Sequence, residues 1–190
     1  MSPYFANAAV FLIHTLFGLY ILAVMLRLLL QWVRADFYNP LSQFLVKITN
    51  PPLRPLRRII PGWGGIDLAS VTLLLILQVA EIFLSGLVVG RTLGWAGTLV
   101  ISAAKLFNMV LDIFFFAILI QVILSWVAPG TYNPVTTLLY RLTETVLAPA
   151  RRIIPAVGGL DLSPILVIIV LQLLKYLIVS PLSDVGMSLG

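Results

Sequence analysis

The chain has 190 residues, of which 61% are hydrophobic and only 10% are charged, and its mean hydropathy is +1.09. Soluble domains carry about 25% charged residues, so this composition excludes a soluble globular protein and predicts an integral membrane protein. Cysteine is absent, which excludes disulfides and thiolate metal sites, and with a net charge of +5 the basic residues are expected to contact anionic lipid rather than nucleic acid.

Four stretches are long and apolar enough to cross the hydrocarbon core, which is roughly 30 Å thick and needs about 20 residues. We predict membrane-spanning helices near residues 6–33, 68–90, 98–127 and 162–180. The first stretch has no charged residue before Arg27 and lacks the basic start of a secretory signal, so it is expected to be a retained membrane helix.

Three motifs occur twice with the same spacing. Every pair is offset by 94 residues (132 − 38), which predicts a tandem duplication. We place the two repeats at residues 6–90 and 98–180, within one integrated membrane domain. Two spans per repeat make the duplication parallel, so the inverted-repeat logic of many transporters does not apply. The paired motifs are Tyr38-Asn39-Pro40 with Tyr132-Asn133-Pro134, Pro55-x-Arg57-Arg58-Ile59-Ile60-Pro61 with Pro149-x-Arg151-Arg152-Ile153-Ile154-Pro155, and Gly64-Gly65-x-Asp67 with Gly158-Gly159-x-Asp161.

Basic residues are concentrated in the two long connections, 34–67 and 128–161. The opposite side of the predicted bundle offers only Arg91. By the positive-inside rule, the connections are expected to be cytoplasmic and both termini periplasmic. The eight basic residues of the connections are Arg34, Lys47, Arg54, Arg57, Arg58, Arg141, Arg151 and Arg152.

Each long connection begins with Asn-Pro, which is typical of a helix start. Apolar residues then recur at helical spacing, which predicts a short amphipathic helix in the membrane interface. A second short element is expected at residues 57–60 and 151–154, where prolines at both ends limit its length. The Gly-Gly pairs permit a tight bend, and Asp67 and Asp161 are expected to cap the spans that follow.

The repeated arginines admit two interpretations. Arg57, Arg58, Arg151 and Arg152 could simply anchor the connections to acidic lipid headgroups. Alternatively, they could form a docking or lipid-binding surface together with the Tyr-Asn-Pro motifs, because repetition of the whole string exceeds what orientation alone requires. The residues of that second interpretation also include Tyr38, Asn39, Pro40, Tyr132, Asn133 and Pro134.

Ionisable residues within the predicted spans are candidate functional residues. Glu81, Asp112 and Lys175 are expected at about the same depth, so Lys175 could neutralise either carboxylate; the alternative is an ion or proton path. Lys105 is expected nearer the outer surface. Gln78 and Gln172 lie one turn away and could complete the hydrogen bonding. His14 is expected to bond between helices rather than to bind a metal, because the chain has no second histidine.

Motifs of catalysis are missing from the sequence. It has no Gly-rich phosphate loop and no HExxH, and a Ser-His-Asp arrangement would have to use the single His14. We therefore expect no enzymatic activity, no cofactor and no metal site.

The repeated blocks give the chain a resemblance to the YggT family of bacterial and plastid membrane proteins. The stretch at residues 36–44, DFYNPLSQF, looks like the two-repeat form from gamma-proteobacteria, and the resemblance covers about residues 10 to 180. It implies an inner-membrane protein whose relatives are linked to osmotic tolerance, to cell division and envelope organisation, and in plastids to assembly of a membrane cytochrome.

Together these patterns predict an all-α membrane protein of about four transmembrane helices in two parallel tandem repeats, with short interfacial helices in its connections. The expected function is that of a non-catalytic assembly or envelope-organising factor. The alternative is a small ion channel or transport accessory that uses the Glu81, Asp112 and Lys175 layer. Expected partners are anionic lipid headgroups and another membrane protein or a second copy of the chain, and not nucleic acid.

Overall fold

The computed structural model describes residues 3–128, 130, 132–154 and 161–190 of the chain. Within them every named element is helical. Four stretches are long and apolar enough to cross a membrane: α1, α3, α4 and the run from α6 to α7. The prediction of an all-α membrane protein with four spans is therefore confirmed. The elements are α1 (Pro3–Trp32), α2 (Pro40–Ile59), α3 (Leu68–Val89), α4 (Trp95–Val127), α5 (Pro134–Ile153), α6 (Ser163–Leu174), a π-helical turn η1 (Lys175–Val179) and α7 (Ser180–Ser188).

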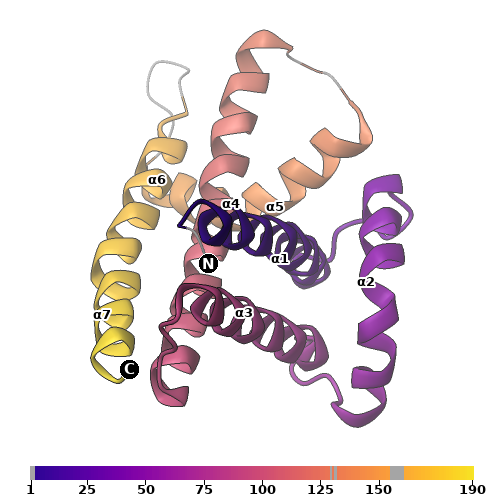
Figure 1. The fold of residues 1–190 in the computed structure, drawn as a ribbon. Coiled ribbons are helices and arrows are strands. Elements are labelled where there is room, and N and C mark those ends of the chain that lie inside the picture. Colours follow the sequence, from indigo (N-terminus) through magenta and orange to yellow (C-terminus); the bar gives the residue numbers. More distant parts are fainter. Residues whose placement is uncertain (1–2, 129, 131, 155–160) are drawn as a thin grey trace.

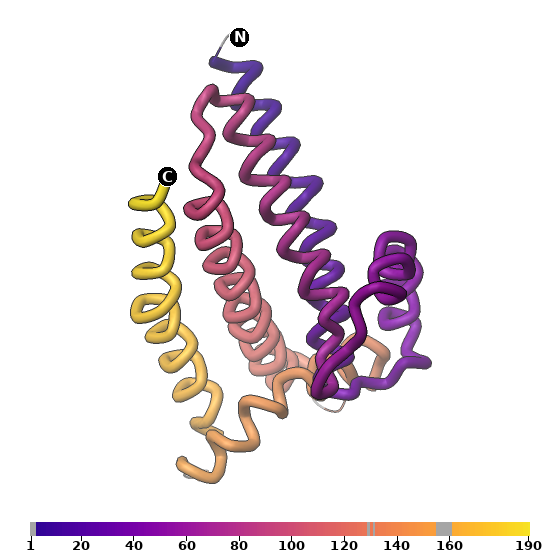
Figure 2. Tube along the Cα trace, turned by 90° about the horizontal axis from the view of Figure 1, so that it is seen from below, coloured from indigo at the N-terminus to yellow at the C-terminus, as the bar shows by residue number. Residues whose placement is uncertain are grey.

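The two repeats are built alike: a long span, an amphipathic helix and a second span. In the first repeat α1 packs against α3, in the second α4 packs against α7, and α3 contacts α4 between them (Figure 1). Figure 2 shows the spans running side by side, with α1 beginning and α7 ending at the same end of the bundle. The amphipathic helices α2 and α5 lie across the spans towards the other end. Termini on one side and long connections on the other agree with the predicted arrangement.

The hydrophobic core lies towards the end of the bundle that holds α2 and α5. Its most completely buried large side chains are Ile21, Leu53, Ile118 and Leu147, one from each of α1, α2, α4 and α5. Both repeats thus contribute to one core. The spans α1 and α4 make few contacts with each other, so α3 and the amphipathic helices join the two repeats.

The predicted helix starts at the two Asn-Pro motifs are confirmed. Asn39 caps α2 by accepting a hydrogen bond from the backbone N–H of Leu41, and Pro40 occupies the first turn. Asn133 forms a capping box with Thr136 at the start of α5. Asn39 also donates from its amide to the Pro134 carbonyl at 2.6 Å, which joins the starts of the two amphipathic helices.

The prediction of two short elements in each connection is wrong. Both α2 and α5 are continuous helices of 20 residues, although α2 contains Pro51, Pro52 and Pro55. A proline leaves the carbonyl four residues earlier without its helical donor. For Pro52 that carbonyl belongs to Ile48, and the Tyr20 hydroxyl of α1 donates to it at 3.3 Å. Packing against α1 thus supplies a donor that the sequence of α2 lacks.

The last span is longer than predicted, because it continues past residue 180 to Ser188. The π-helical turn carries it across Pro181, which has no N–H to donate. The Ser180 N–H bonds back to the Lys175 carbonyl, five residues earlier. In the first repeat, the expected bend at Gly64 and Gly65 is confirmed, since both have positive φ and close a tight turn. Gly158 and Gly159 lie outside the described residues.

Candidate functional site

One pair of repeat-related contacts fixes each amphipathic helix to its first span. In the first repeat, Arg27 of α1 donates to the Thr49 hydroxyl of α2 at 2.6 Å, and both residues are buried. In the second, Gln121 of α4 accepts a hydrogen bond from Thr143 of α5. Although Arg27 lies near the end of its span, where a long basic side chain can reach the headgroups, it is turned inward and buried. The offset of 94 relates Arg27 to Gln121 and Thr49 to Thr143, so the two contacts are equivalent in the two repeats.

A second pair of repeat-related contacts ties the end of each amphipathic helix to the next span. Arg57 donates to Asp67 through two nitrogens, and Arg151 donates to Asp161 at 2.9 Å. The first arginine of each Arg-Arg pair is therefore engaged within the chain. This intramolecular role was not among the two interpretations drawn from the sequence.

The two aspartates differ in how they meet the following helix. Asp67 occupies the expected N-cap position of α3, where its carboxylate accepts from the Ser70 hydroxyl at 2.6 Å and is also stabilised by the Ser70 backbone N–H. Asp161 accepts from the backbone N–H of Ser163, as expected of a cap. Burial raises the pKa of the Asp67 carboxyl, yet hydrogen bonds from Arg57 and Ser70 outweigh it and hold that pKa below its ordinary value. The pKa of Asp161 is lowered in the same way: hydrogen bonds from Ser163 and Arg151 outweigh its burial.

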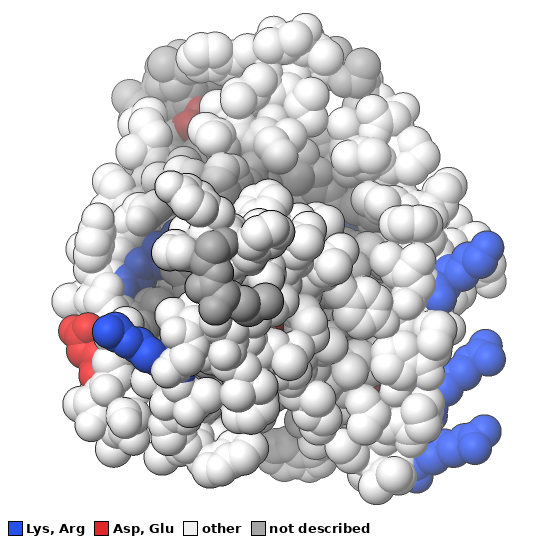
Figure 3. Space-filling view, in the orientation of Figure 1, with Lys and Arg blue, Asp and Glu red and all other residues white. Residues whose placement is uncertain are grey.

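The remaining motif residues point outward. Arg58, Arg152, Tyr38 and Tyr132 are all exposed. Figure 3 shows Lys and Arg side chains projecting from the edge of the molecule where α2 lies. The exposed basic residues of that helix are Lys47, Arg54, Arg57 and Arg58. These positions suit contact with acidic headgroups, and their docking role stays a prediction.

Four charged groups within the spans, Glu81, Lys105, Asp112 and Lys175, are paired across helices. Lys175 forms an ion pair with Asp112 of α4, and Asn108 donates to the same carboxylate at 2.7 Å. The expectation that Lys175 neutralises a carboxylate is thus confirmed, with Asp112 as its partner. The π-helical turn begins at Lys175, so the irregular part of the span coincides with its half-buried charge.

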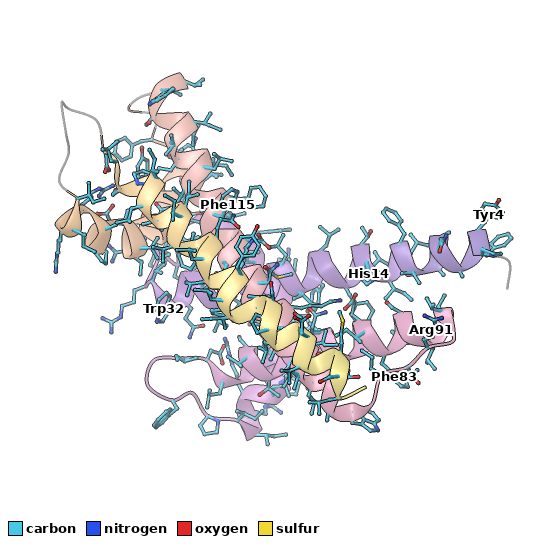
Figure 4. The ribbon with its side chains drawn as sticks, turned by 90° about the vertical axis from the view of Figure 1, so that its left-hand side faces the viewer. Tyr4, His14, Trp32, Phe83, Arg91 and Phe115 are labelled. Atoms are coloured by element: carbon cyan, nitrogen blue, oxygen red, sulfur yellow. The ribbon has the colours of Figure 1, made fainter. Side chains whose placement is uncertain are left out.

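Glu81 lies apart from that pair and has its own partners. His14 of α1 contacts it through Nδ1, Lys105 of α4 lies 3.3 Å away, and Gln78 donates at 2.5 Å. Because a carboxylate only accepts, the His14 Nδ1 carries the hydrogen of this contact. Figure 4 follows α1 from Tyr4 past His14 to Trp32 and places this histidine well inside the span. Gln172 is half-buried in α6, and its expected part in the bonding stays a prediction.

These polar groups border a large cavity between the two repeats, here called the inter-repeat cavity. Its volume is about 980 Å³. His14, Glu81, Lys105, Asn108 and Asp112 line one part of it. The rest of its wall is largely apolar and comes from α1, α4 and the amphipathic helices, including Leu22, Leu26, Leu41, Phe116, Ile120, Leu138 and Leu139. Each carboxylate there has a lysine partner: Lys105 pairs with Glu81, and Lys175 pairs with Asp112.

The polar cluster does not resemble a metal centre. Across the described parts of the chain, no three His, Asp or Glu side chains are grouped closely enough to hold a metal ion. The groups present instead offer hydrogen-bond donors and acceptors beside an apolar wall.

The family model CCB3/YggT matches the chain twice, at residues 6–88 and 100–182. An uncharacterised Pseudomonas aeruginosa protein is 48% identical over 93% of this chain and 91% of its own length. An uncharacterised Vibrio alginolyticus protein is 46% identical over 90% of this chain and 93% of its own. The uncharacterised protein YggT of Escherichia coli strain K12 is 36% identical, covering 95% and 94%. No solved structure matches significantly.

Proposed function

The chain belongs to the CCB3/YggT family, and we propose that it is a non-catalytic assembly or envelope-organising factor of the inner membrane. In this proposal the inter-repeat cavity receives a transmembrane helix of another membrane protein. The observation that carries the proposal is the cavity itself, with a long apolar wall and polar groups at one end.

The cavity has a length that suits a helix in the bilayer. On α1 its lining extends from His14 to Leu30, which at 1.5 Å per residue is about 24 Å. This is most of the roughly 30 Å hydrocarbon thickness. A helix laid against α1 and α4 would contact leucine, isoleucine and phenylalanine side chains along most of that distance.

Polar groups favour a protein occupant over lipid tails. An apolar groove alone gives a helix no advantage, because lipid chains are as apolar as leucine. Lys105 has donors beyond the one used for Glu81, the second ring nitrogen of His14 can make a hydrogen bond of its own, and the Asn108 carbonyl oxygen can accept a further bond. A lipid tail satisfies none of these groups. A partner helix with a polar side chain at that depth satisfies several.

The alternative, ion conduction, draws support from the charged residues that line the cavity. However, Glu81 and Asp112 are already neutralised by cations of the same chain. Towards the amphipathic helices the lining turns to leucine and valine, which do not replace the hydration shell of an ion. The geometry therefore favours assembly over transport.

Site-specific photo-crosslinking in intact membranes tests the proposal, with one position inside the cavity and one outside. Ile120 lines the cavity and is 48% exposed, whereas Ile123 of the same helix does not line it and is 51% exposed. A photoreactive residue at Ile120 should capture a membrane protein that the Ile123 control does not. The crosslink should map to a membrane-spanning segment of the captured protein.

A second variant separates specific docking from random collision. Asn108→Leu removes one polar contact, and an interhelical hydrogen bond contributes about 0.6 kcal/mol on average, so crosslinking at Ile120 should fall about threefold. Equal capture at the two isoleucines, or lipid as the only product at Ile120, would refute helix docking. Ion flux through liposomes containing the purified protein, lost in a folded Asp112→Asn variant, would establish the transport alternative instead.

A further inference from the structure

A second cavity, of about 340 Å³, lies between the end of α1 and the first part of α2. We call it the arginine cavity, because Arg27, Arg34 and Arg57 all line it. Three guanidinium groups around one space create a strongly positive potential, and guanidinium forks match phosphate and carboxylate groups. The arginine cavity is separate from the polar cluster of the inter-repeat cavity and does not depend on the function proposed above.

Two of its three arginines form no ion pair within the described part of the chain. Asp67 pairs with Arg57. Among the described residues, no Asp or Glu forms an ion pair with Arg27 or Arg34. Arg27 is nevertheless only 7% exposed. An unpaired buried charge is costly, so an anion from outside the chain would stabilise this arrangement.

Ser42 supplies an independent sign of a ligand. Its side chain is buried and lines the arginine cavity, yet within the described part of the chain its hydroxyl has no hydrogen-bond partner. Buried hydroxyl groups almost always have one. An oxygen-rich anion held by Arg27 and Arg34 would accept that hydrogen bond.

The second repeat shows that the positive charge of Arg27 is not needed to fix the amphipathic helix. At the equivalent positions Gln121 replaces Arg27 and Ala128 replaces Arg34. Gln121 still bonds Thr143, as Arg27 bonds Thr49. A neutral side chain is therefore sufficient for the structural contact, and the guanidinium groups of the first repeat are available for another purpose.

We propose that the arginine cavity binds the phosphate group of an anionic phospholipid, held by Arg27, Arg34 and the Ser42 hydroxyl. Its remaining wall includes Leu30, Phe37 and Leu45, which suit the glycerol and acyl part of a lipid and would not suit a free hydrated phosphate. The cavity also lies at headgroup depth, because α1 ends at Trp32 and α2 follows as an interfacial helix.

Lipid retention by the purified full-length protein tests this inference. The protein is extracted from vesicles of phosphatidylethanolamine and phosphatidylglycerol, and bound phosphatidylglycerol is counted by native mass spectrometry. The test variant is Arg27→Gln with Arg34→Ala, which installs the residues of the second repeat. The matched control is Lys47→Gln with Arg54→Ala, which removes the same charge from exposed positions of α2 outside the arginine cavity.

The test variant should retain about tenfold less phosphatidylglycerol, because it loses charge-assisted hydrogen bonds, while the control should lose far less, because exposed basic side chains contact headgroups without enclosing them. Arg34→Ala alone, at an exposed residue without an ion pair, gives the same comparison without altering the buried contact and should lower retention by a smaller factor. Ser42→Ala should also lower retention with no loss of stability. Equal retention in test and control variants would overturn the inference. Displacement of the lipid by inorganic phosphate alone would overturn the assignment to a phospholipid.

Discussion

The ion pair between Lys175 and Asp112 gives the most direct measure of what the buried charges contribute. Lys175→Met leaves the Asp112 carboxylate with Asn108 as its remaining partner. Breaking a fully buried pair costs about 3–5 kcal/mol, and an unpaired charge near the bilayer centre costs about 2.5–3.5 kcal/mol. The two side chains are 21% and 34% exposed. Because the cavity admits some solvation, we expect a loss of about 2–3 kcal/mol in the free energy of unfolding.

A double-mutant cycle distinguishes pairing from simple loss of packing. Asp112→Asn alone should cost about as much as Lys175→Met, whereas the double variant should cost only about 1 kcal/mol, since no unpaired charge remains. Reversible unfolding in bicelles or mixed micelles supplies the free energies. Lys105→Met serves as the control and should cost about 1 kcal/mol or less, because Glu81 keeps His14 and Gln78. Strictly additive losses in the double variant would refute the reasoning.

Three further predictions follow from local contacts. A Cβ added at Gly97 would lie 2.5 Å from a backbone oxygen of α7, so Gly97→Ala should cost about 1–3 kcal/mol in unfolding measurements, whereas Gly18→Ala, with nothing within 4 Å, should be tolerated. The folded-state pKa of Asp67 lies below its unfolded value of about 3.9, so its stabilisation is present above that pH and is lost as pH falls through the lower folded value; Asp67→Asn should flatten this acid dependence of the thermal midpoint. Arg57→Lys should lower stability by about 1 kcal/mol because it loses the two-nitrogen contact with Asp67, while Arg58→Lys should have no effect on the same assay. An Arg57→Lys variant as stable as the native protein would contradict the intramolecular role of the first arginine.

Much of the architecture follows from local sequence. The number of spans and the capped starts of α2 and α5 were predicted, because apolar length and Asn-Pro caps act over a few turns of one helix. The parallel relation of the two repeats followed from the two spans in each repeat. Because of the interior prolines, two short elements were predicted where α2 is one continuous helix. Tyr20, which bonds the carbonyl released by Pro52, comes from a different helix and is 28 residues away along the chain.

The sequence alone could not predict which charged side chains pair within the membrane. By itself it determined which residues are charged, which spans carry them and that the two repeats are offset by 94 residues. Depth alone allowed Lys175 to meet either carboxylate. The tertiary structure joined it to Asp112 and gave Glu81 to His14 and Lys105, because helix rotation and packing decide which side chains face each other. The same packing turned Arg27 inward and left the Ser42 hydroxyl without a hydrogen-bond partner among the described residues. The inter-repeat cavity exists because the two repeats are folded against each other, whereas the arginine cavity forms where α2 packs on α1 within the first repeat.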